Sequence, residues 1–362
     1  MIPVATSVEN RRTMMVDKVY CMSSYLMYRT IADHSKTFAE GNQPKFYEND
    51  IERKPVYDSY QLEAELKKQV ELACADGKAA LALSGGIDSA ILAKFMPKGS
   101  TVYTFKCVVP GMSVTDESVA AAKYAKECGL LHKIVEIYWE DFEKYTPILM
   151  KNKGAPFHSI EVQIYKASLQ AQKDGFTTLI FGESADLNYG GLSDLLSKDR
   201  TVGDFIQRYS YVPPYMALKE YEMPVDTILP HIHDGYVDVH EFCRHPFFVE
   251  AMGSYSNATE AAGIKLKTPY AHTYMGVPLN YERIRRGENK YFVREVFNRL
   301  YEGFEVPPKT PMPRPMNEWF KNWKGPTRPE FWPHCSDNMT GDQKWLVYCL
   351  EKFLDYLDTC ET

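Results

Sequence analysis

The sequence lacks several features that would assign it to a membrane, a secreted scaffold or a nucleic-acid surface. No apolar run approaches the roughly 18 residues of a membrane-spanning helix, and no apolar signal core follows the first charged residues. The eight cysteines in 362 residues form no CxxC pair and are too sparse for a disulfide scaffold. A net charge of −6 disfavours broad contact with nucleic acid. We therefore expect a cytoplasmic protein with reduced thiols, and neither membrane nor nucleic acid as a partner.

Short apolar runs alternate with helical patterns over the first half of the chain. Apolar residues make up 44% of the sequence, which is typical of a globular protein. The alternation predicts a parallel sheet with helices on both faces, an α/β fold class. The strands are expected at 79–83, 101–109, 132–137 and 177–181, and the helices at 58–76, 89–96, 115–128 and 161–174. Thr115 is the expected N-cap of the third of these helices.

Three regions are expected from this pattern. Residues 1–57 form an N-terminal extension, 58–200 the α/β core, and 201–362 a mainly helical region that completes the active site. Within the last region, helical patterns cover 201–222, 238–262 and 289–302. The five prolines of 306–315 predict a stiff extended loop.

The strongest motif is the glycine-rich stretch LSGGIDS, which follows an expected strand and opens an expected helix. The glycines let a ligand approach the backbone, and the helix start offers free amides to an anion. Because a carboxylate beside phosphate needs a cation between them, the aspartate implies Mg²⁺. The pattern therefore predicts an ATP site formed by Leu83, Ser84, Gly85, Gly86, Asp88 and Ser89.

A second carboxylate motif, FGESADLNYGG, begins at residue 181 and also follows an expected strand. Parallel strands present their carboxyl ends at one edge of a sheet. We therefore expect Asp186 to meet Asp88 there, the two acids holding Mg²⁺ against a triphosphate. Gly182 is expected to belong to the same nucleotide site.

These motifs resemble those of ATP pyrophosphatases with a PP-loop, and most of all the synthetase domain of asparagine synthetases. The stretch SGGIDS is similar to their phosphate loop, and GESAD to the family's GEGADE motif. The resemblance implies a PP-loop fold, with Glu183 as general base or amine-orienting acid and Asp186 as metal ligand. Ser184 stands where the family has glycine, and Leu187 and Asn188 also depart from the motif.

Weaker resemblances continue toward the C-terminus. KTPYAHTYM (267–275), ENKYFVREVF (288–297) and VPPKTPMPRPMNEWF (306–320) are similar to three later segments of the same family. They imply that Lys290 and Lys309 contact pyrophosphate and the adenylate. Fixed ammonium groups of this kind stabilise the charge that builds up on a leaving pyrophosphate. Arg294, one helical turn after Lys290, either shares this role or lies exposed.

The stretch before the phosphate loop is too short for the glutaminase domain of a complete asparagine synthetase, and Cys21 is not an N-terminal nucleophile. The resemblance thus implies an AMP- and pyrophosphate-forming ligase that adenylates a small-molecule or peptide carboxylate. Its nitrogen would come from ammonia, from a separate ammonia donor or from an amine. A homodimer stays open.

Two other interpretations of the motifs stay open. One is a related enzyme that thiolates or aminates RNA or a nucleotide, although no paired cysteines or basic module indicate it. The other is a module that binds ATP or AMP without catalysis. Dependence of ATP–pyrophosphate exchange on a carboxylic acid separates a ligase from the non-catalytic module, and adding RNA to the same assay tests the enzyme that acts on RNA.

Overall fold

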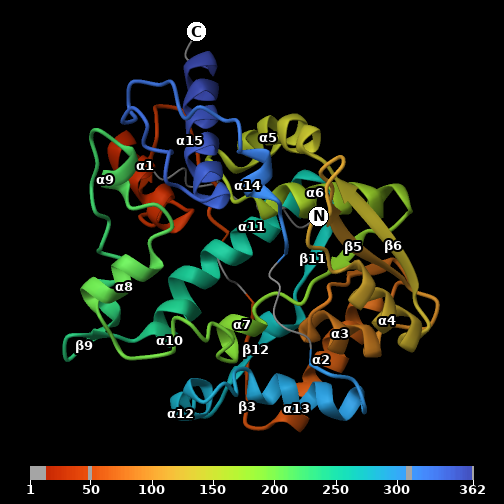
Figure 1. Cartoon of the computed structure of the whole chain (residues 1–362). Coiled ribbons are helices and arrows are strands. Elements are labelled where there is room, and N and C mark those ends of the chain that lie inside the picture. The colour runs from red at the N-terminus through yellow and green to blue at the C-terminus, as the bar shows by residue number, and fades with distance from the viewer. Residues whose placement is uncertain (1–13, 48–50, 307–311, 361–362) are drawn as a thin grey trace, which may run out of the picture.

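A five-stranded parallel sheet lies at the centre of the molecule (Figure 1). The computed structural model describes residues 14–47, 51–306 and 312–360. All neighbouring strands of this sheet run parallel, which confirms the expected α/β class. In spatial order the strands are β11 (Lys265–Lys267), β7 (Thr178–Ile180), β4 (Ala79–Ala82), β5 (Thr101–Cys107) and β6 (Leu131–Ile137).

Alternate residues of the central strands point into two separate hydrophobic cores. Ala79 and Leu81 join one core, whereas Ala80 and Ala82 join the other. This is the two-residue period of a strand that is covered on both faces. The first core packs against α2 (Ser59–Cys74), α3 (Ile87–Phe95), α4 (Ser118–Cys128) and α13 (Tyr291–Leu300). The second packs against α5 (Trp139–Lys153), α6 (Ile160–Lys173) and α11 (Phe248–Ala261).

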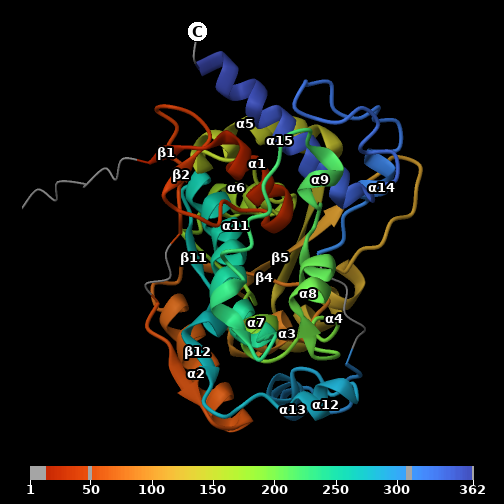
Figure 2. The same cartoon turned by 90° about the vertical axis from the view of Figure 1, so that its left-hand side faces the viewer.

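The first and last long helices pack together at one end of the molecule. The helices α1 (Lys18–Tyr28) and α15 (Gly341–Cys360) are in contact, and α15 also contacts α5. Figure 2 shows α15 running along the top of the molecule, far from α12 (Tyr281–Arg285) and α13. Residues 14–47 of the N-terminal extension are therefore part of the folded body, and Cys21 is fully buried among core residues.

Short elements complete the described structure. The remaining helices and turns are α7 (Ala185–Asn188), α8 (Val202–Tyr209), α9 (Pro214–Ala217), η1 (Leu229–His231), α10 (Val239–Phe242), η2 (Cys243–Phe247), η3 (Pro269–His272) and α14 (Met316–Trp319). The remaining strands are β1 (Met15–Val16), β2 (Lys36–Thr37), β3 (Lys54–Val56), β8 (Arg200–Thr201), β9 (Ile232–His233), β10 (Tyr236–Val237) and β12 (Thr273–Met275). Across the three described ranges, none of the helices has both the length and the apolar character to span a bilayer.

Several local expectations need correction. Thr115 is not the N-cap of α4, because the helix begins at Ser118 and Glu117 occupies the cap position. The broad helical pattern at 201–222 resolves into two short helices, α8 and α9, since Pro213 and Pro214 interrupt it. The edge strand β11 was not predicted, and it brings residues beyond 201 into the sheet of the core. Residues 307–311 of the proline-rich loop lie outside the described residues.

Candidate active site

The loop between β4 and α3 is held by two serine hydroxyls. The hydroxyls of Ser84 and Ser89 lie 2.9 Å apart, and the Ser84 amide donates to the Ser89 oxygen at 2.9 Å. The amide of Gly86 donates to the Ser84 oxygen at 3.1 Å. Gly86 is also the N-cap of α3 and provides no side chain to satisfy the amides of the first turn. These amides are available to an anion, and the helix dipole favours one there.

Two glycines allow the elements around this loop to approach closely. A Cβ on Gly85 would lie 3.1 Å from the Cβ of Ala120 on α4. A Cβ on Gly182, at the end of β7, would lie 3.1 Å from the backbone nitrogen of Ser89. Both distances are tighter than ordinary carbon contacts, so a side chain at either position would push the loop or its neighbours away. Gly182 thus sets how closely the second carboxylate motif meets the first.

Asp88 and Asp186 meet at the side chain of Lys290. The Lys290 Nζ lies 2.7 Å from an oxygen of Asp88 and 3.1 Å from Oδ1 of Asp186. Burial alone would lower the pKa of Lys290, but the charges of Asp88 and Asp186 outweigh it and raise the pKa. Three segments far apart in the sequence, α3, α7 and the start of α13, thus bring two acids and one ammonium group together.

Lys290 has a strained local backbone, and Asp186 lies in a tight turn that Gly191 closes. Lys290 is only 6% exposed and has a left-handed conformation with φ of 50°. The backbone of Asp186 accepts a hydrogen bond from the Gly191 amide at 2.8 Å. A Cβ on Gly191 would collide with the Asp186 carboxylate, so glycine is required there. Strained backbone of this kind persists where surrounding contacts stabilise it, commonly at functional sites.

Glu183 lies next to these groups as a buried carboxyl. Burial raises its pKa to about 7, although hydrogen bonds from the Ser184 backbone and the Tyr255 hydroxyl act in the opposite direction. A carboxyl with a pKa near neutrality can accept a proton from a reacting group and release it again. Tyr255 comes from α11, and no sequence pattern had singled it out.

These residues line one cavity of about 470 Å³ at the carboxyl ends of the strands. Its cationic lining residues are Arg29, Lys290, Arg294 and Arg314. Arg294 also donates to Asn289, and Arg314 pairs with Asp342 at 3.2 Å. The cavity therefore offers several fixed positive charges to a polyanion. Lys309, the other lysine expected at this site, lies outside the described residues.

Glu117 is a further acid of this cavity that sequence patterns did not indicate. Burial raises its pKa to about 7, and the Gly85 amide donates a hydrogen bond to it. The carboxyl therefore contacts the loop that carries the glycine-rich motif. Its position just before α4 makes it look like an ordinary capping residue in the sequence, so only the fold reveals this contact.

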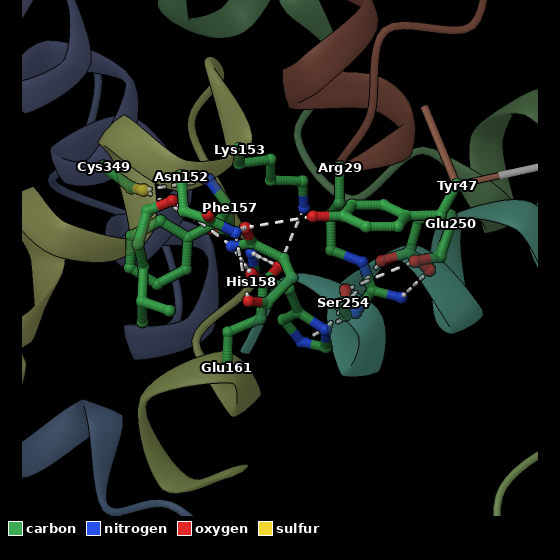
Figure 3. A network of polar contacts seen from close by, with 12 residues as sticks. Arg29, Tyr47, Asn152, Lys153, Phe157, His158, Glu161, Glu250, Ser254 and Cys349 are labelled. Atoms are coloured by element: carbon green, nitrogen blue, oxygen red, sulfur yellow. Dashed lines mark hydrogen bonds and ion pairs between the residues drawn. The ribbon is translucent and has the colours of Figure 1, made fainter. Parts of the chain in front are cut away.

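A polar cluster around Arg29 forms another wall of the cavity (Figure 3). The guanidinium donates to Tyr211 at 2.6 Å, to Glu250 at 3.0 Å and to the His158 Nε2 at 2.9 Å. Burial lowers the pKa of His158 well below its usual value, and the Arg29 charge lowers it further. His158 is thus neutral, and its Nε2 accepts from Arg29.

The acidic residues of the cavity show whether its donor groups fit the expected magnesium ion. Across residues 14–47, 51–306 and 312–360, no group of three or more His, Cys, Asp and Glu side chains is arranged for a metal ion. Asp88 and Asp186 are a pair, and Mg²⁺ in nucleotide sites commonly takes one or two carboxylates, with substrate phosphates and waters as its other ligands. The donor set therefore fits a nucleotide-bound magnesium ion.

Comparisons with known proteins agree with the position of these motifs. A family model described as asparagine synthase matches residues 61–239, which contain the glycine-rich loop and both aspartates. The comparison with curated proteins gave no match.

Several solved structures resemble parts of the chain weakly. An NH3-dependent NAD synthetase from Campylobacter jejuni is 15% identical, with 37% of this chain and 61% of that chain covered and a TM-score of 0.26. An NMN synthetase from Francisella tularensis is 12% identical, with 71% and 100% covered and a TM-score of 0.27. A U34-tRNA thiolase from Methanococcus maripaludis is 16% identical, with 73% and 92% covered and a TM-score of 0.24. The chain thus spans less than two thirds of the NAD synthetase that it matches.

Proposed function

We propose that the protein is an ATP-dependent carbon–nitrogen ligase, because residues 61–239 match a family model described as asparagine synthase. It activates a substrate carboxylate as an acyl-adenylate and then transfers the acyl group to ammonia or an amine. The observation that carries this proposal is the meeting of Asp88, Asp186 and Lys290 beside the glycine-rich loop. That arrangement suits a bound triphosphate, because free amides, a cation and two acids that could hold a metal ion share one cavity.

In the first step the substrate carboxylate attacks the α-phosphorus of ATP. An oxygen–phosphorus bond forms, the bond between the α-phosphate and the β-phosphate breaks, and pyrophosphate leaves. The amides of the loop that ends at Ser89 would hold the phosphates, and Lys290 would stabilise the charge that builds up on pyrophosphate. Lys309 would share this role, as the family resemblance implies.

Asp88 and Asp186 would hold Mg²⁺, which neutralises phosphate charge and so permits two carboxylates beside a polyphosphate. Lys290 now neutralises the same two acids. We therefore infer that the Lys290 side chain exchanges partners, from the carboxylates to the phosphates, when a nucleotide binds.

In the second step ammonia or an amine attacks the acyl carbon and AMP leaves. The nitrogen must lose a proton as the amide forms, and Glu183 would orient the amine and accept that proton. Its pKa of about 7 suits this task, because a carboxyl with a pKa near the operating pH can both accept and release a proton. The hydroxyl of Tyr255 would hold the carboxyl in place.

The test is product analysis after incubation with ATP, Mg²⁺ and a panel of carboxylic acids, with and without ammonium. We expect AMP, pyrophosphate and an amide, together with ATP–pyrophosphate exchange that depends on the acid. ADP as the nucleotide product would contradict the proposal. Exchange that needs added RNA would instead favour a nucleic-acid substrate, and ATP binding with no turnover under any condition would favour a non-catalytic module.

Two variants separate the steps. Asp88→Asn should lower exchange at least about 100-fold, because it removes a charge that acts in the transition state. Glu183→Gln should leave exchange intact and lower amide formation by about 100-fold or more. Glu143→Gln, an exposed acid on α5, is the matched control and should change neither step. If Glu183→Gln abolishes exchange as well, Glu183 is needed for adenylation and its assignment to the amine step is wrong.

A further inference from the structure

A second cavity of about 650 Å³ lies beside the candidate active site. The N-terminal extension forms one wall of it, with residues of α1, of the loop after α1 and of the segment before β3. The other wall comes from α10, η2 and the first turn of α11. Its aromatic lining residues are Tyr20, Tyr28, Tyr209, Phe242 and Phe248. The volume is in the usual range for a small-molecule pocket.

Two arginines form a cationic part of this cavity. Among the described residues, neither Arg53 nor Arg244 forms an ion pair with a carboxylate, and the Nε atoms of both are buried without a hydrogen-bond partner. Burial lowers the pKa of Arg53, and the nearby charge of Arg244 lowers it further. Two half-buried like charges are costly to keep together, and a bound anion would relieve that cost.

Aromatic rings and an amide hold the two guanidinium groups in place. The Arg53 group lies 4.9 Å from the ring centre of Phe248, and the Arg244 group lies 5.0 Å from that of Tyr274. Arg53 also donates a hydrogen bond to the side chain of Asn188. Held in this way, the two groups are arranged before any ligand binds, which lowers the entropy cost of binding a carboxylate.

Two aspartates form an anionic part of the same cavity. Burial raises the pKa of Tyr20, and the charges of Asp33 and Asp226 raise it further, because both carboxylates lie near its phenol. Asp33 accepts hydrogen bonds from the amide and hydroxyl of Ser35. Asp226 forms no ion pair with any described residue, and neither aspartate pairs with Arg53 or Arg244. The cavity therefore keeps its positive and negative groups apart.

The Arg29–Glu250 ion pair separates this cavity from the candidate active site. Glu250 lines both cavities, whereas Arg29 lines only the catalytic one. Figure 3 shows the two side chains reaching toward each other. Because Arg29 neutralises Glu250, this acid adds no free negative charge to the second cavity. A ligand in the second cavity would thus lie against Glu250, which also lines the cavity of the candidate active site.

We propose that the second cavity binds an amino acid with an aromatic or large apolar side chain. The carboxylate would contact Arg53 and Arg244, the ammonium group would lie near Asp33 and Asp226, and the side chain would pack against the aromatic wall. Each part of this ligand matches one part of the lining, and a molecule with only one charge would leave the other pair of residues without an oppositely charged group of the ligand. The proposal concerns binding alone and does not depend on the ligase reaction.

The experiment measures binding by calorimetry to the full chain without ATP, using L-phenylalanine, L-tyrosine and L-leucine as probes. Two analogues of phenylalanine test the two ends: phenylalaninamide lacks the carboxylate, and 3-phenylpropanoate lacks the ammonium group. We expect at least one of the three amino acids to bind at or below about 1 mM, and both analogues to bind about tenfold more weakly. The Asp88→Asn variant should bind the probe like the natural chain, since Asp88 lies in the other cavity.

Variants of the arginines and of Asp226 test which residues bind the carboxylate and which bind the ammonium group of the amino acid. Arg53→Gln and Arg244→Gln should each weaken binding of the amino acid about tenfold and leave the affinity for phenylalaninamide unchanged. Asp226→Asn should weaken binding of the amino acid and leave the affinity for 3-phenylpropanoate unchanged. Arg286→Gln, which changes an exposed arginine at the C-cap of α12, is the control. Arg53→Lys keeps the charge and replaces Arg53→Gln if that variant does not fold. Absence of binding by all three amino acids at about 10 mM, or binding that Arg53→Gln and Asp226→Asn leave unchanged, would overturn the proposal.

Discussion

Single residues in the candidate site hold conformations that their chemistry does not favour. Ser184 has φ of 73°, a left-handed conformation that costs a residue with a Cβ about 1 kcal/mol more than glycine. This explains why the resembling family has glycine at the corresponding position. The serine keeps the same backbone path, and its hydroxyl lies 3.6 Å from the sulfur of Met252. The departure from the motif thus changes the energy of the turn while Asp186, two residues later, still reaches Lys290.

At the same scale, the buried carboxyl of Glu117 predicts a pH dependence of stability. Its pKa rises from an ordinary 4.5 to about 7 in the folded protein, mainly because of burial. The folded state therefore holds this proton more tightly than the unfolded chain does. The stability that the group contributes is fully present below pH 4.5 and is lost as the pH rises to about 7. Glu117→Gln cannot ionise, so the variant should become more stable relative to the natural chain over that interval.

Urea unfolding of both proteins at a series of pH values measures this difference. Glu183 titrates in the same range, but it is present in both chains and cancels in the comparison. The exposed control Glu143→Gln should give a difference that does not vary between pH 4.5 and about 7. A stability difference between Glu117→Gln and the natural chain that stays constant, or that moves in the opposite direction, would show that Glu117 is not a buried acid with a raised pKa.

At the scale of elements, a buried ion pair joins three helices behind the site. Lys153 at the end of α5 lies 2.8 Å from Glu161 on α6 (Figure 3). Asn257 of α11 donates to the other carboxylate oxygen at 2.6 Å. The Glu161 side chain is fully buried. Lys153→Met should therefore destabilise the protein by about 3 kcal/mol, because it leaves a buried charge without its partner.

The double variant Lys153→Met with Glu161→Met should recover most of that loss, since it removes both charges at once. Lys166→Met is a matched control, because Lys166 also joins α6 to α5, through Asp141, but its side chain is 25% exposed. That variant should cost at most about 1 kcal/mol. Equal losses for Lys153→Met and Lys166→Met in urea unfolding would mean that burial does not set the cost.

Elements also show which parts of the fold could be predicted from the sequence. The strands β4, β5 and β7 were predicted because they are buried apolar runs close to glycine or proline. The strand β6 was also predicted, although most of its residues are exposed. The strand β11 was not, because an edge strand that reads Lys-Leu-Lys carries no apolar run. The helix α5 was not predicted either, because Pro147 inside it weakens the helical pattern.

For the site, both aspartates and the phosphate loop follow from motifs that occupy a few neighbouring residues. Tyr255, Arg314 and Glu117 do not, because each reaches the cavity only through packing between distant elements. The bridge from Lys290 to both aspartates joins residues about 100 or 200 positions apart, and no local pattern encodes such a contact.

On the scale of the whole molecule, both ends of the chain support one backbone group beside the candidate active site. The carbonyl of Phe157 accepts from the Tyr25 hydroxyl of α1 at 2.8 Å and from the Trp345 indole of α15 at 3.1 Å. The next residue, His158, lines the cavity of the candidate active site. The N-terminal extension and the C-terminal helix therefore act on the site through the same peptide.

This shared acceptor predicts coupling between the two ends. Tyr25→Phe and Trp345→Phe each leave the Phe157 carbonyl with its other strong donor, so the lost hydrogen bond should cost about 1 kcal/mol in each. The double variant leaves this buried carbonyl only the weak thiol contact of Cys349 at 3.4 Å. Its loss of stability should exceed the sum of the single losses by about 1 kcal/mol, because an unsatisfied buried carbonyl costs more than a hydrogen bond gains.

A double-mutant cycle in urea measures this coupling, and the loss of ring volume at each position cancels within the cycle. Trp332→Phe changes a half-exposed indole on the surface and should leave stability nearly unchanged, alone or combined with Tyr25→Phe. Strictly additive losses for Tyr25 and Trp345 would mean that the two ends of the chain stabilise the molecule independently. Coupling would instead mean that a change at either end alters the support of His158, so that the helices of both termini belong to the functional unit.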